Sequence, residues 1–381
     1  MKPAHRTRWS GVRTVDDFEQ LARKRTPRAV YDFVAGAAEL ELSRDGAVDA
    51  FRRCVFHPRV LRDVAGCTTA TTVLGASIRF PVILGPTGFT RIMHAAGESA
   101  VARAAGRAGL PYVLSTLGTT SIEELAEDAP ATDRWFQLYL WKDRARSQDF
   151  LARARDSGYR VLVLTVDTPV AGARHRDVRN GLTIPPSLTP RTVAGILRKP
   201  RWLFDLLTTK PLAFESLGEA TNAIGLINTI FDPSVTIDDI GWLRSEWPGP
   251  IVVKGIQRGE DAKNVAAAGA DAIAVSNHGG RQLDRAAAPL DVLPRVIEAV
   301  GDSTEVYVDG GVRSGSDVAI AVDLGARAVF VARPYLYALM AGGESGVDHL
   351  LALLLDDYAR TLRLLGVSQT SDLDGSFVTR T

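Results

Sequence analysis

Short, largely apolar runs recur along the chain from about residue 80 onward, and a longer segment with helical periodicity follows each of them. Runs rich in β-branched residues without polar alternation are typical of parallel strands buried on both faces. We predict eight strands, at 82–84, 112–114, 136–138, 161–164, 251–253, 272–275, 306–308 and 328–331. Segments 97–109, 147–158, 260–269 and 316–325 are predicted helices, each ending in a glycine that commonly stops a helix.

Eight strand–helix units in series predict an α/β fold, a closed (β/α)₈ TIM barrel rather than an open sheet. We predict one domain over residues 1–381, with an N-terminal cap at 1–80 against the bottom or side of the barrel. The barrel occupies 81–340, and a C-terminal helical segment occupies 341–381. Between the fourth and fifth strands, an insertion at about 170–250 is too long for a simple crossover and predicts a lid, an insertion or an interaction element.

Composition narrows the class of protein without changing this fold. Apolar residues make up 46% of the chain and the formal net charge is +1, so no global charge favours nucleic acid. Cys54 and Cys67 are too few for a disulfide framework or a cysteine-based zinc site, and no metal is predicted. Residues 1–11 lack a secretory signal and no apolar run approaches the ~20 residues of a membrane span. We therefore predict a cytoplasmic protein, at most peripheral to a membrane.

Polar residues cluster directly after the predicted strands. In a barrel these positions surround one mouth, where active sites are built. The cluster comprises Pro86, Thr87, Gly88, Ser115, Gln137, Tyr139, Thr165, Asp167, Lys254, Ser276, His278, Arg281, Asp309 and Arg333.

The last two strands carry residues suited to a phosphate group. Gly310 and Gly311 can offer backbone N–H groups, and Arg313 and Arg333 add bidentate charge on adjacent loops. The diglycine alone fits a tight turn equally well. The two arginines favour the phosphate site, which in a barrel lies at this position.

His278 follows a buried strand and has Arg281 three positions further on, so it is a candidate base beside a carboxylate-binding arginine. Asp167, on another strand of the same mouth, is a candidate partner for the imidazole, or a helix cap or turn residue. Lys254 stands alone in an apolar run. It could form a Schiff base, pair with a carboxylate or supply positive charge to a cofactor.

Residues 276–284 (SNHGGRQLD) resemble the signature of the FMN-dependent 2-hydroxy-acid dehydrogenase and oxidase family, which includes glycolate oxidase, L-lactate dehydrogenase and mandelate dehydrogenase. Further matches occur in order along essentially the whole chain. They lie at 27–33 (PRAVYDF), 86–88 (PTG), 136–139 (FQLY), 165–169 (TVDTP), 253–255 (VKG) and 309–313 (DGGVR).

The resemblance implies roles for individual residues. His278 is the base that takes a substrate proton, and Asp167 stabilises the imidazolium that forms. Arg281 and Arg174 bind the substrate carboxylate, and Tyr139 hydrogen-bonds near the substrate oxygen. The implied product is a 2-oxo acid, and oxygen, a quinone or another acceptor reoxidises the cofactor.

The implied cofactor is FMN, with Lys254 beside the pyrimidine end of the flavin. The implied cofactor-binding residues are Pro86, Thr87, Gly88, Ser115, Gln137, Thr165, Lys254, Ser276, Asp309, Gly310, Gly311, Arg313, Ala332 and Arg333. Among these, Gly311, Arg313 and Arg333 are implied to hold the phosphate.

Four positions depart from the family pattern. Phe33 replaces a tyrosine whose hydroxyl helps to bind the carboxylate, and Leu117 replaces a bulky tryptophan of glycolate oxidase. Gly88 resembles mandelate dehydrogenase, and Ala332 replaces a glycine with little expected effect. These departures favour an L-2-hydroxy acid with a bulky or aromatic side chain, similar to mandelate.

Two other functions stand beside this one. The first is flavin-dependent oxidative tailoring of a peptide or specialised metabolite. It is suggested by Phe33, whose missing hydroxyl weakens binding of a substrate carboxylate. The second is a non-redox barrel enzyme, such as a phosphosugar isomerase, that uses the phosphate site without flavin.

Residues 197–207 (LRKPRWLFDLL) mix basic and bulky apolar side chains, similar to the segment through which mandelate dehydrogenase touches the membrane. Such a stretch can lie in a lipid interface. The alternative is a lid that packs over the active site or a neighbouring subunit. Related barrels are often homotetramers, so a homo-oligomer is expected.

Overall fold

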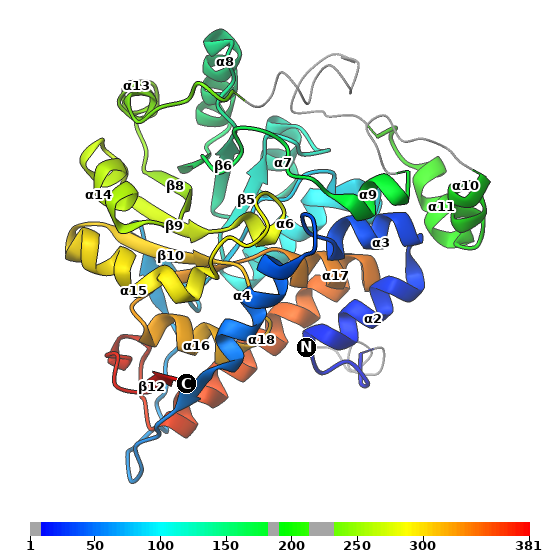
Figure 1. Ribbon diagram of the computed structural model, residues 1–381. Helices are drawn as coiled ribbons and strands as arrows, with labels where there is room; N and C mark the ends of the chain where they lie inside the picture. The colour runs from blue at the N-terminus through cyan, green and yellow to red at the C-terminus, as the bar shows by residue number, and fades with distance from the viewer. Residues whose placement is uncertain (1–8, 182–189, 213–231) are drawn as a thin grey trace.

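The computed structural model describes residues 9–181, 190–212 and 232–381. Eight parallel strands close into a barrel in which the last strand pairs with the first (Figure 1), so the predicted fold is confirmed. The strands are β4 (Val82–Leu84), β5 (Tyr112–Ser115), β6 (Arg134–Leu138), β7 (Val161–Thr165), β8 (Ile251–Ile256), β9 (Ala272–Ser276), β10 (Glu305–Asp309) and β11 (Ala328–Val331). Each predicted strand corresponds to one of these.

Helices surround the barrel, and the predicted segments lie within a few residues of the observed ones. Segment 97–109, for example, is a helix whose cap Gly109 has the left-handed φ of 66° that favours glycine. These helices are α6 (Gly97–Ala108), α7 (Ile122–Asp128), α8 (Arg144–Asp156), α13 (Asp238–Glu246), α14 (Gly259–Ala267), α15 (Pro289–Val300), α16 (Gly315–Asp323), α17 (Arg333–Gly342) and α18 (Glu344–Leu365). Short elements are α5 (Thr90–Met93), η2 (His278–Gly280), η3 (Gly301–Ser303) and η4 (Thr370–Asp372).

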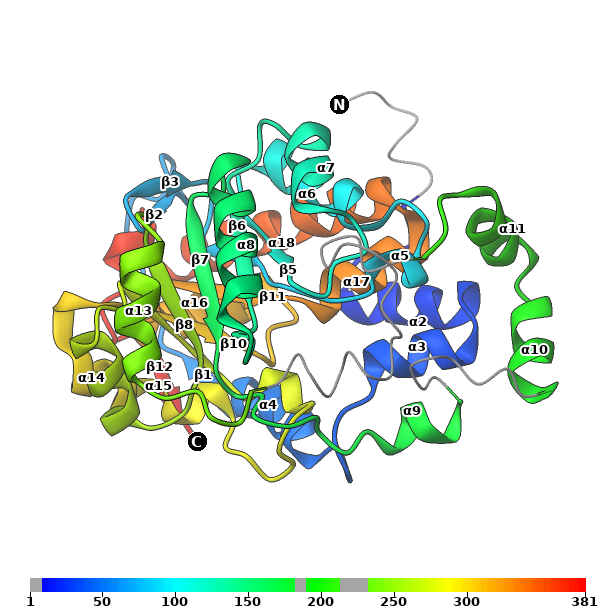
Figure 2. The same cartoon turned by 90° about the horizontal axis from the view of Figure 1, so that it is seen from above.

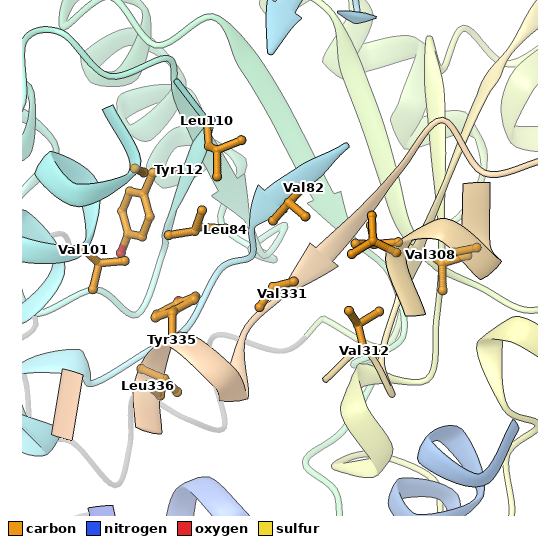
Figure 3. Packing of buried hydrophobic residues seen from close by; sticks show 14 of the residues in the cluster. Val82, Leu84, Val101, Leu110, Tyr112, Val308, Val312, Val331, Tyr335 and Leu336 are labelled. Carbon is orange, nitrogen blue, oxygen red and sulfur yellow. The ribbon is translucent and has the colours of Figure 1, made fainter. Parts of the chain in front are cut away.

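Two hydrophobic cores follow from the two faces of the strands. Inside the barrel, the rings of Trp135, Tyr307 and Phe330 lie within 6.4 Å of one another and fill the lumen. Outside it, apolar side chains such as Leu84 pack between the strands and the helices (Figure 3). The barrel is therefore a solid support for its two ends.

A β-hairpin closes the end of the barrel where the strands begin. It consists of β2 (Thr71–Val73) and β3 (Ala76–Ile78). The Leu74 backbone N–H donates to the Glu305 carboxylate at 3.1 Å, and Arg160 donates to the Leu74 carbonyl at 2.9 Å. Glu305 begins β10 and Arg160 directly precedes β7, so the hairpin lies at the amino ends of the strands.

Helices α2 (Val15–Arg25), α3 (Arg28–Ala35) and α4 (Leu42–Arg52) lie instead at the opposite end, the mouth. Residues 1–80 were expected against the bottom or side, and for these helices that expectation is wrong. The reason is a set of long-range hydrogen bonds. Ala38 N–H donates to the Gly280 carbonyl at 2.8 Å, and Asp284 accepts from the N–H groups of Leu40 and Ser43. Helix α2 packs along α17 (Figures 1 and 2).

The predicted insertion contains α9 (His175–Arg179), α10 (Pro190–Leu197) and α11 (Pro200–Thr208). Helices α10 and α11 stand at the side of the molecule, beyond α2 and α3 (Figure 2). Residues 182–189 and 213–231 of the insertion lie outside the described residues, as do residues 1–8. At the other end of the chain, β12 (Val378–Arg380) pairs with β1 (Cys54–Phe56). Among the described helices, none has the length and apolarity to cross a membrane.

Candidate active site

The mouth of the barrel opens into a cavity of about 1690 Å³, and the structure brings the predicted site residues together around it. Those that line it are Phe33, Pro86, Thr87, Gly88, Ser115, Tyr139, Thr165, Arg174, Lys254, His278, Arg281, Asp309, Gly310, Gly311, Arg313, Ala332 and Arg333. Asp167, Gln137 and Ser276 lie behind this wall and hydrogen-bond to residues that form it.

His278 and Asp167 form a hydrogen-bonded pair, with His278 Nδ1 2.9 Å from Asp167 Oδ1. The main chain of His278 is fixed as well, because its backbone N–H donates to Ser276 Oγ at 2.9 Å. Burial raises the pKa of Asp167, but the charge and hydrogen bond of His278 outweigh burial and lower it. An ionised Asp167 accepts the Nδ1 hydrogen, which leaves Nε2 as the basic nitrogen. Asp167 is therefore a partner of His278 rather than a helix cap.

Gly255 makes room for this pair. Its φ of +116° suits only glycine, and a Cβ there would lie 2.8 Å from the Asp167 Cβ. The strand β8 can thus pass directly beneath Asp167 only because residue 255 has no side chain.

Lys254 forms a buried ion pair with a carboxylate, one of the arrangements that its sequence left open. Its Nζ lies 2.7 Å from Asp309 Oδ2 and 3.1 Å from Ser276 Oγ, and Ser276 Oγ donates to the same carboxylate at 2.7 Å. Burial lowers the pKa of Lys254, but the nearby Asp309 charge outweighs it and raises the pKa. The ammonium is therefore held as a fixed positive charge at the cavity wall.

Tyr139 contributes a hydroxyl that stays protonated. Burial, with the charge of Asp167 as the next cause, raises the pKa of Tyr139 to about 12. At neutral pH this phenol can donate a hydrogen bond to an oxygen in the cavity.

Arg281 and Arg174 differ in their partners: Arg174 Nε lies 3.8 Å from Asp177 Oδ2, whereas Arg281 has no carboxylate within ion-pair distance among the described residues. Arg281 Nη1 donates to the carbonyls of Phe33 at 2.6 Å and Gly36 at 3.2 Å, neither of which is an anion. Burial and the charges of Arg174 and Arg333 lower the pKa of Arg281 to about 9. A cavity that depresses a guanidinium pKa in this way favours a bound anion.

The two arginines predicted at the phosphate differ in their partners. Arg333 donates to the carbonyls of Val34 and Gly36, both at 2.9 Å, and burial lowers its pKa. Arg313 instead pairs with the carboxylates of Asp16, at 2.7 Å, and Glu19 on α2. Two carboxylates therefore offset the charge of Arg313, whereas Arg333 contacts neutral carbonyls and can still pair with a bound anion.

One side of the cavity is apolar. The rings of Phe33 and Phe89 meet edge to face with centroids 6.1 Å apart, and Leu117 and Met93 extend the same wall. A Cβ at Gly88 would lie only 2.9 Å from the Leu117 Cβ, so these two positions are in direct contact.

The cavity fits the flavin nucleotide that the resemblance implies. Gln137 is buried, and its Oε1 accepts from Ser115 Oγ at 2.9 Å, while its Nε2 has no hydrogen-bond partner among the described residues. A buried amide donor of this kind calls for an acceptor, such as a ring carbonyl. Gly310 and Gly311 have φ values of 118° and 85° and expose backbone at the same mouth.

Some site residues were not predicted. The Tyr335 hydroxyl donates to the Gly85 carbonyl at 2.7 Å and accepts from Thr87 Oγ1 at 2.7 Å, so it holds the loop after β4. Phe89 and Asp177 line the cavity, whereas Tyr335 supports it from behind through Thr87. A search of the first turn of the helix after β11, and not only of the residues directly after the strand, would have found Tyr335. Helical spacing from Arg174 would have found Asp177.

A family model described as FMN-dependent dehydrogenase matches residues 22–380. A putative L-lactate dehydrogenase of Mycobacterium tuberculosis is 50% identical over 368 residues, which cover 96% of this chain and 89% of that protein. The 2-hydroxyacid oxidase 1 of Mus musculus is 41% identical, over 96% of this chain and 95% of its own.

Two solved structures are also similar to this chain over nearly its whole length. The crystal structure of a monotopic membrane protein, (S)-mandelate dehydrogenase, is similar with a TM-score of 0.93 and 38% identity over 97% of this chain and 100% of that chain. A mandelate oxidase variant with (S)-mandelic acid has a TM-score of 0.84 and 36% identity, over 97% of this chain and 99% of its own.

Proposed function

The chain belongs to the FMN-dependent dehydrogenase family, and from this premise we propose that it oxidises an L-2-hydroxy acid with a bulky or aromatic side chain. Use of FMN and oxidation of a 2-hydroxy acid follow from the family. That membership sets aside the non-redox alternative. The side-chain class and the roles of individual residues are the proposal.

The observation that carries the residue roles is the His278–Asp167 pair at 2.9 Å, on the same cavity as the under-neutralised Arg281. Arg281 and Arg174 bind the substrate carboxylate and orient the α-carbon. Nε2 of His278 takes a proton from the substrate, and the Asp167 carboxylate stabilises the imidazolium. Tyr139 donates a hydrogen bond to a substrate oxygen.

Bound FMN supplies the two-electron acceptor. The residues that hold it are those after the strands, with Gln137 and Lys254 at the ring and Arg333 and Gly311 at the phosphate. The fixed charge of Lys254, paired with Asp309, favours negative charge at its end of the ring.

The apolar wall of Phe33, Phe89, Leu117 and Met93 supports a large substrate side chain. An aryl group should gain more binding free energy against this wall than a methyl group does, because the free energy of burial is proportional to the apolar area buried. The similar structures include mandelate enzymes, whereas the similar sequences include L-lactate enzymes, so a direct comparison of substrates is needed.

The test is anaerobic bleaching of the bound flavin by L-mandelate, L-lactate and glycolate, followed by admission of air. Faster bleaching by mandelate supports the proposal, and equal bleaching by lactate or glycolate overturns the bulky-substrate part. The rate of recolouring in air separates an oxidase from a dehydrogenase with another acceptor, such as a quinone. No bleaching by any of these acids would favour the tailoring of a larger molecule.

We further propose that α10 and α11 rest against a membrane surface. Leu197, Phe204 and Leu207 are all more than 60% exposed, while Trp202 Nε1 donates to the Ile92 carbonyl at 3.0 Å and fixes α11 to the body. Outward apolar side chains beside Arg198 and Arg201 suit a lipid interface.

Co-sedimentation with anionic vesicles tests this contact. We expect wild type to bind and Phe204→Ser/Leu207→Ser to lose binding. The matched control is Leu364→Ser, at an equally exposed leucine on α18. Equal sedimentation of all three proteins would contradict the contact.

A further inference from the structure

Arg174 directly precedes α9, a short helix with little else to hold it in place. The helix begins without a side-chain cap, and Val170 and Val178 on either side of Arg174 are about two-thirds exposed. Few apolar contacts therefore hold α9 in place, and Arg174 is tied to that helix by its ion pair with Asp177, at 3.8 Å.

Polar contacts with α3 and the loop that follows it replace this missing packing. Arg176 Nη2 lies 2.6 Å from Glu41 Oε2, and its Nη1 lies 3.6 Å from Asp32 Oδ1. Asn180 Nδ2 donates to Asp32 Oδ2 at 2.8 Å. Arg176 thus joins α9 to Asp32 on α3 and to Glu41 directly before α4.

Both carboxylates are buried, since Asp32 and Glu41 are each 8% exposed. Glu41 also accepts from Arg44 Nη1 at 2.6 Å and from the Ala37 N–H at 3.1 Å. Asp32 also pairs with Arg28 at 3.2 Å, so each carboxylate keeps one arginine if Arg176 is lost. What is lost is the cation that joins α9 to both buried carboxylates. Without Arg176, α9 is expected to move away from Asp32 and Glu41.

The same segment is joined directly to the substrate arginines. The Glu39 N–H donates to the carbonyl of Ala173, the residue before Arg174, at 2.8 Å. The Gly36 carbonyl accepts from Arg281 at 3.2 Å. A displacement between α3 and α9 would therefore change the spacing between Arg174 and Arg281.

We infer that Arg176 is a positioning residue for substrate carboxylate binding: by bridging Asp32 and Glu41 it keeps Arg174 facing the cavity beside Arg281. The inference rests on the proposed function, in which Arg174 and Arg281 bind the carboxylate. Arg176 itself contacts no reacting atom.

The experiment compares two ligands of the same shape on the FMN-loaded protein. Phenylacetate carries a carboxylate and phenylacetamide does not, and neither has the hydroxyl that is oxidised. Their dissociation constants are measured from the change in flavin absorbance. In Arg176→Met the preference for phenylacetate should fall by about tenfold or more, because small misplacements of a binding group have effects of this size. KM for L-mandelate should rise while kcat changes much less.

Three further variants make the result specific. Arg176→Lys should restore most of the preference, and Glu41→Gln should reproduce the loss from the other side of the ion pair. Arg179→Met removes a positive charge from the same helix at an exposed position and should have little effect. Arg176→Lys and Glu41→Gln also decide the question if Arg176→Met fails to fold.

Arg174→Met separates the inference from its premise. If Arg174→Met leaves the preference for phenylacetate intact, the proposed role of Arg174 fails. If Arg174→Met abolishes the preference while Arg176→Met and Glu41→Gln do not change it, the positioning role alone is overturned.

Discussion

The guanidinium carbon of Arg281 lies 4.8 Å from the centroid of the Phe33 ring, and the same guanidinium donates to the Phe33 carbonyl. A phenylalanine at this position thus supports the arginine through its ring face, where a tyrosine would add a hydroxyl for the substrate.

Phe33→Tyr should lower KM for 2-hydroxy acids by about 5- to 150-fold, because a hydrogen bond to a charged carboxylate contributes about 1–3 kcal/mol. Phe33→Leu removes the ring face and should raise KM instead. Steady-state kinetics with L-mandelate measure both changes. Identical KM values for Phe33→Leu and wild type would show that the ring does not hold Arg281.

The pH dependence of substrate binding should report Arg281. Its pKa of about 9 means that the free protein loses the guanidinium charge as the pH rises through that value. We expect kcat/KM to fall there, because this constant reports ionisations of the free enzyme. The dissociation constant of neutral phenylacetamide should stay constant over the same range.

Arg174→Met supplies the internal check on this assignment. Removal of a neighbouring positive charge raises the pKa of Arg281, so the fall in kcat/KM should move to higher pH. A fall that stays at the same pH would assign it to another group.

Asp167→Asn keeps the shape of the partner of His278 but removes its charge. The rate of anaerobic flavin reduction should fall by about 10²- to 10⁴-fold, while the FMN content stays unchanged. Asp302→Asn, at an exposed acid on η3, is the matched control. A fall of less than threefold in Asp167→Asn would remove Asp167 from the mechanism.

Gly255→Ala should both destabilise the protein and slow flavin reduction. The new Cβ would lie 2.8 Å from the Asp167 Cβ, at a φ that costs other residues about 1–3 kcal/mol. Urea unfolding measures the first effect and stopped-flow reduction the second. Gly241→Ala on α13, where the Cβ meets open space, should instead be neutral or stabilising. Equal stability of the two variants would contradict this account of Gly255.

The barrel could be predicted from the sequence because buried parallel strands carry continuous apolar runs. The run at 161–164, for example, became β7 with one further residue, Thr165. Once the strands are predicted, the carboxyl ends of all eight are expected to meet at one mouth. This rule placed His278 and Lys254 at the same site, and both line the observed cavity.

What could not be predicted depends on contacts between distant parts of the chain. The phosphate role of Arg313 stays a prediction, but nothing in the local sequence predicted that its guanidinium pairs with Asp16, 297 positions earlier. The mouth position of α3 depends likewise on the hydrogen bond from Ala38 to Gly280. No local period or spacing encodes such pairings.

The pairing of β1 with β12 has a consequence for synthesis of the protein. During translation, β1 leaves the ribosome long before its partner exists, and α2 must also wait for α17. The mouth depends on α17 in the same way, because Arg333 at the start of α17 donates to the Val34 carbonyl on α3. A nascent chain is therefore expected to complete its mouth only after α17, which ends at Gly342, has left the ribosome.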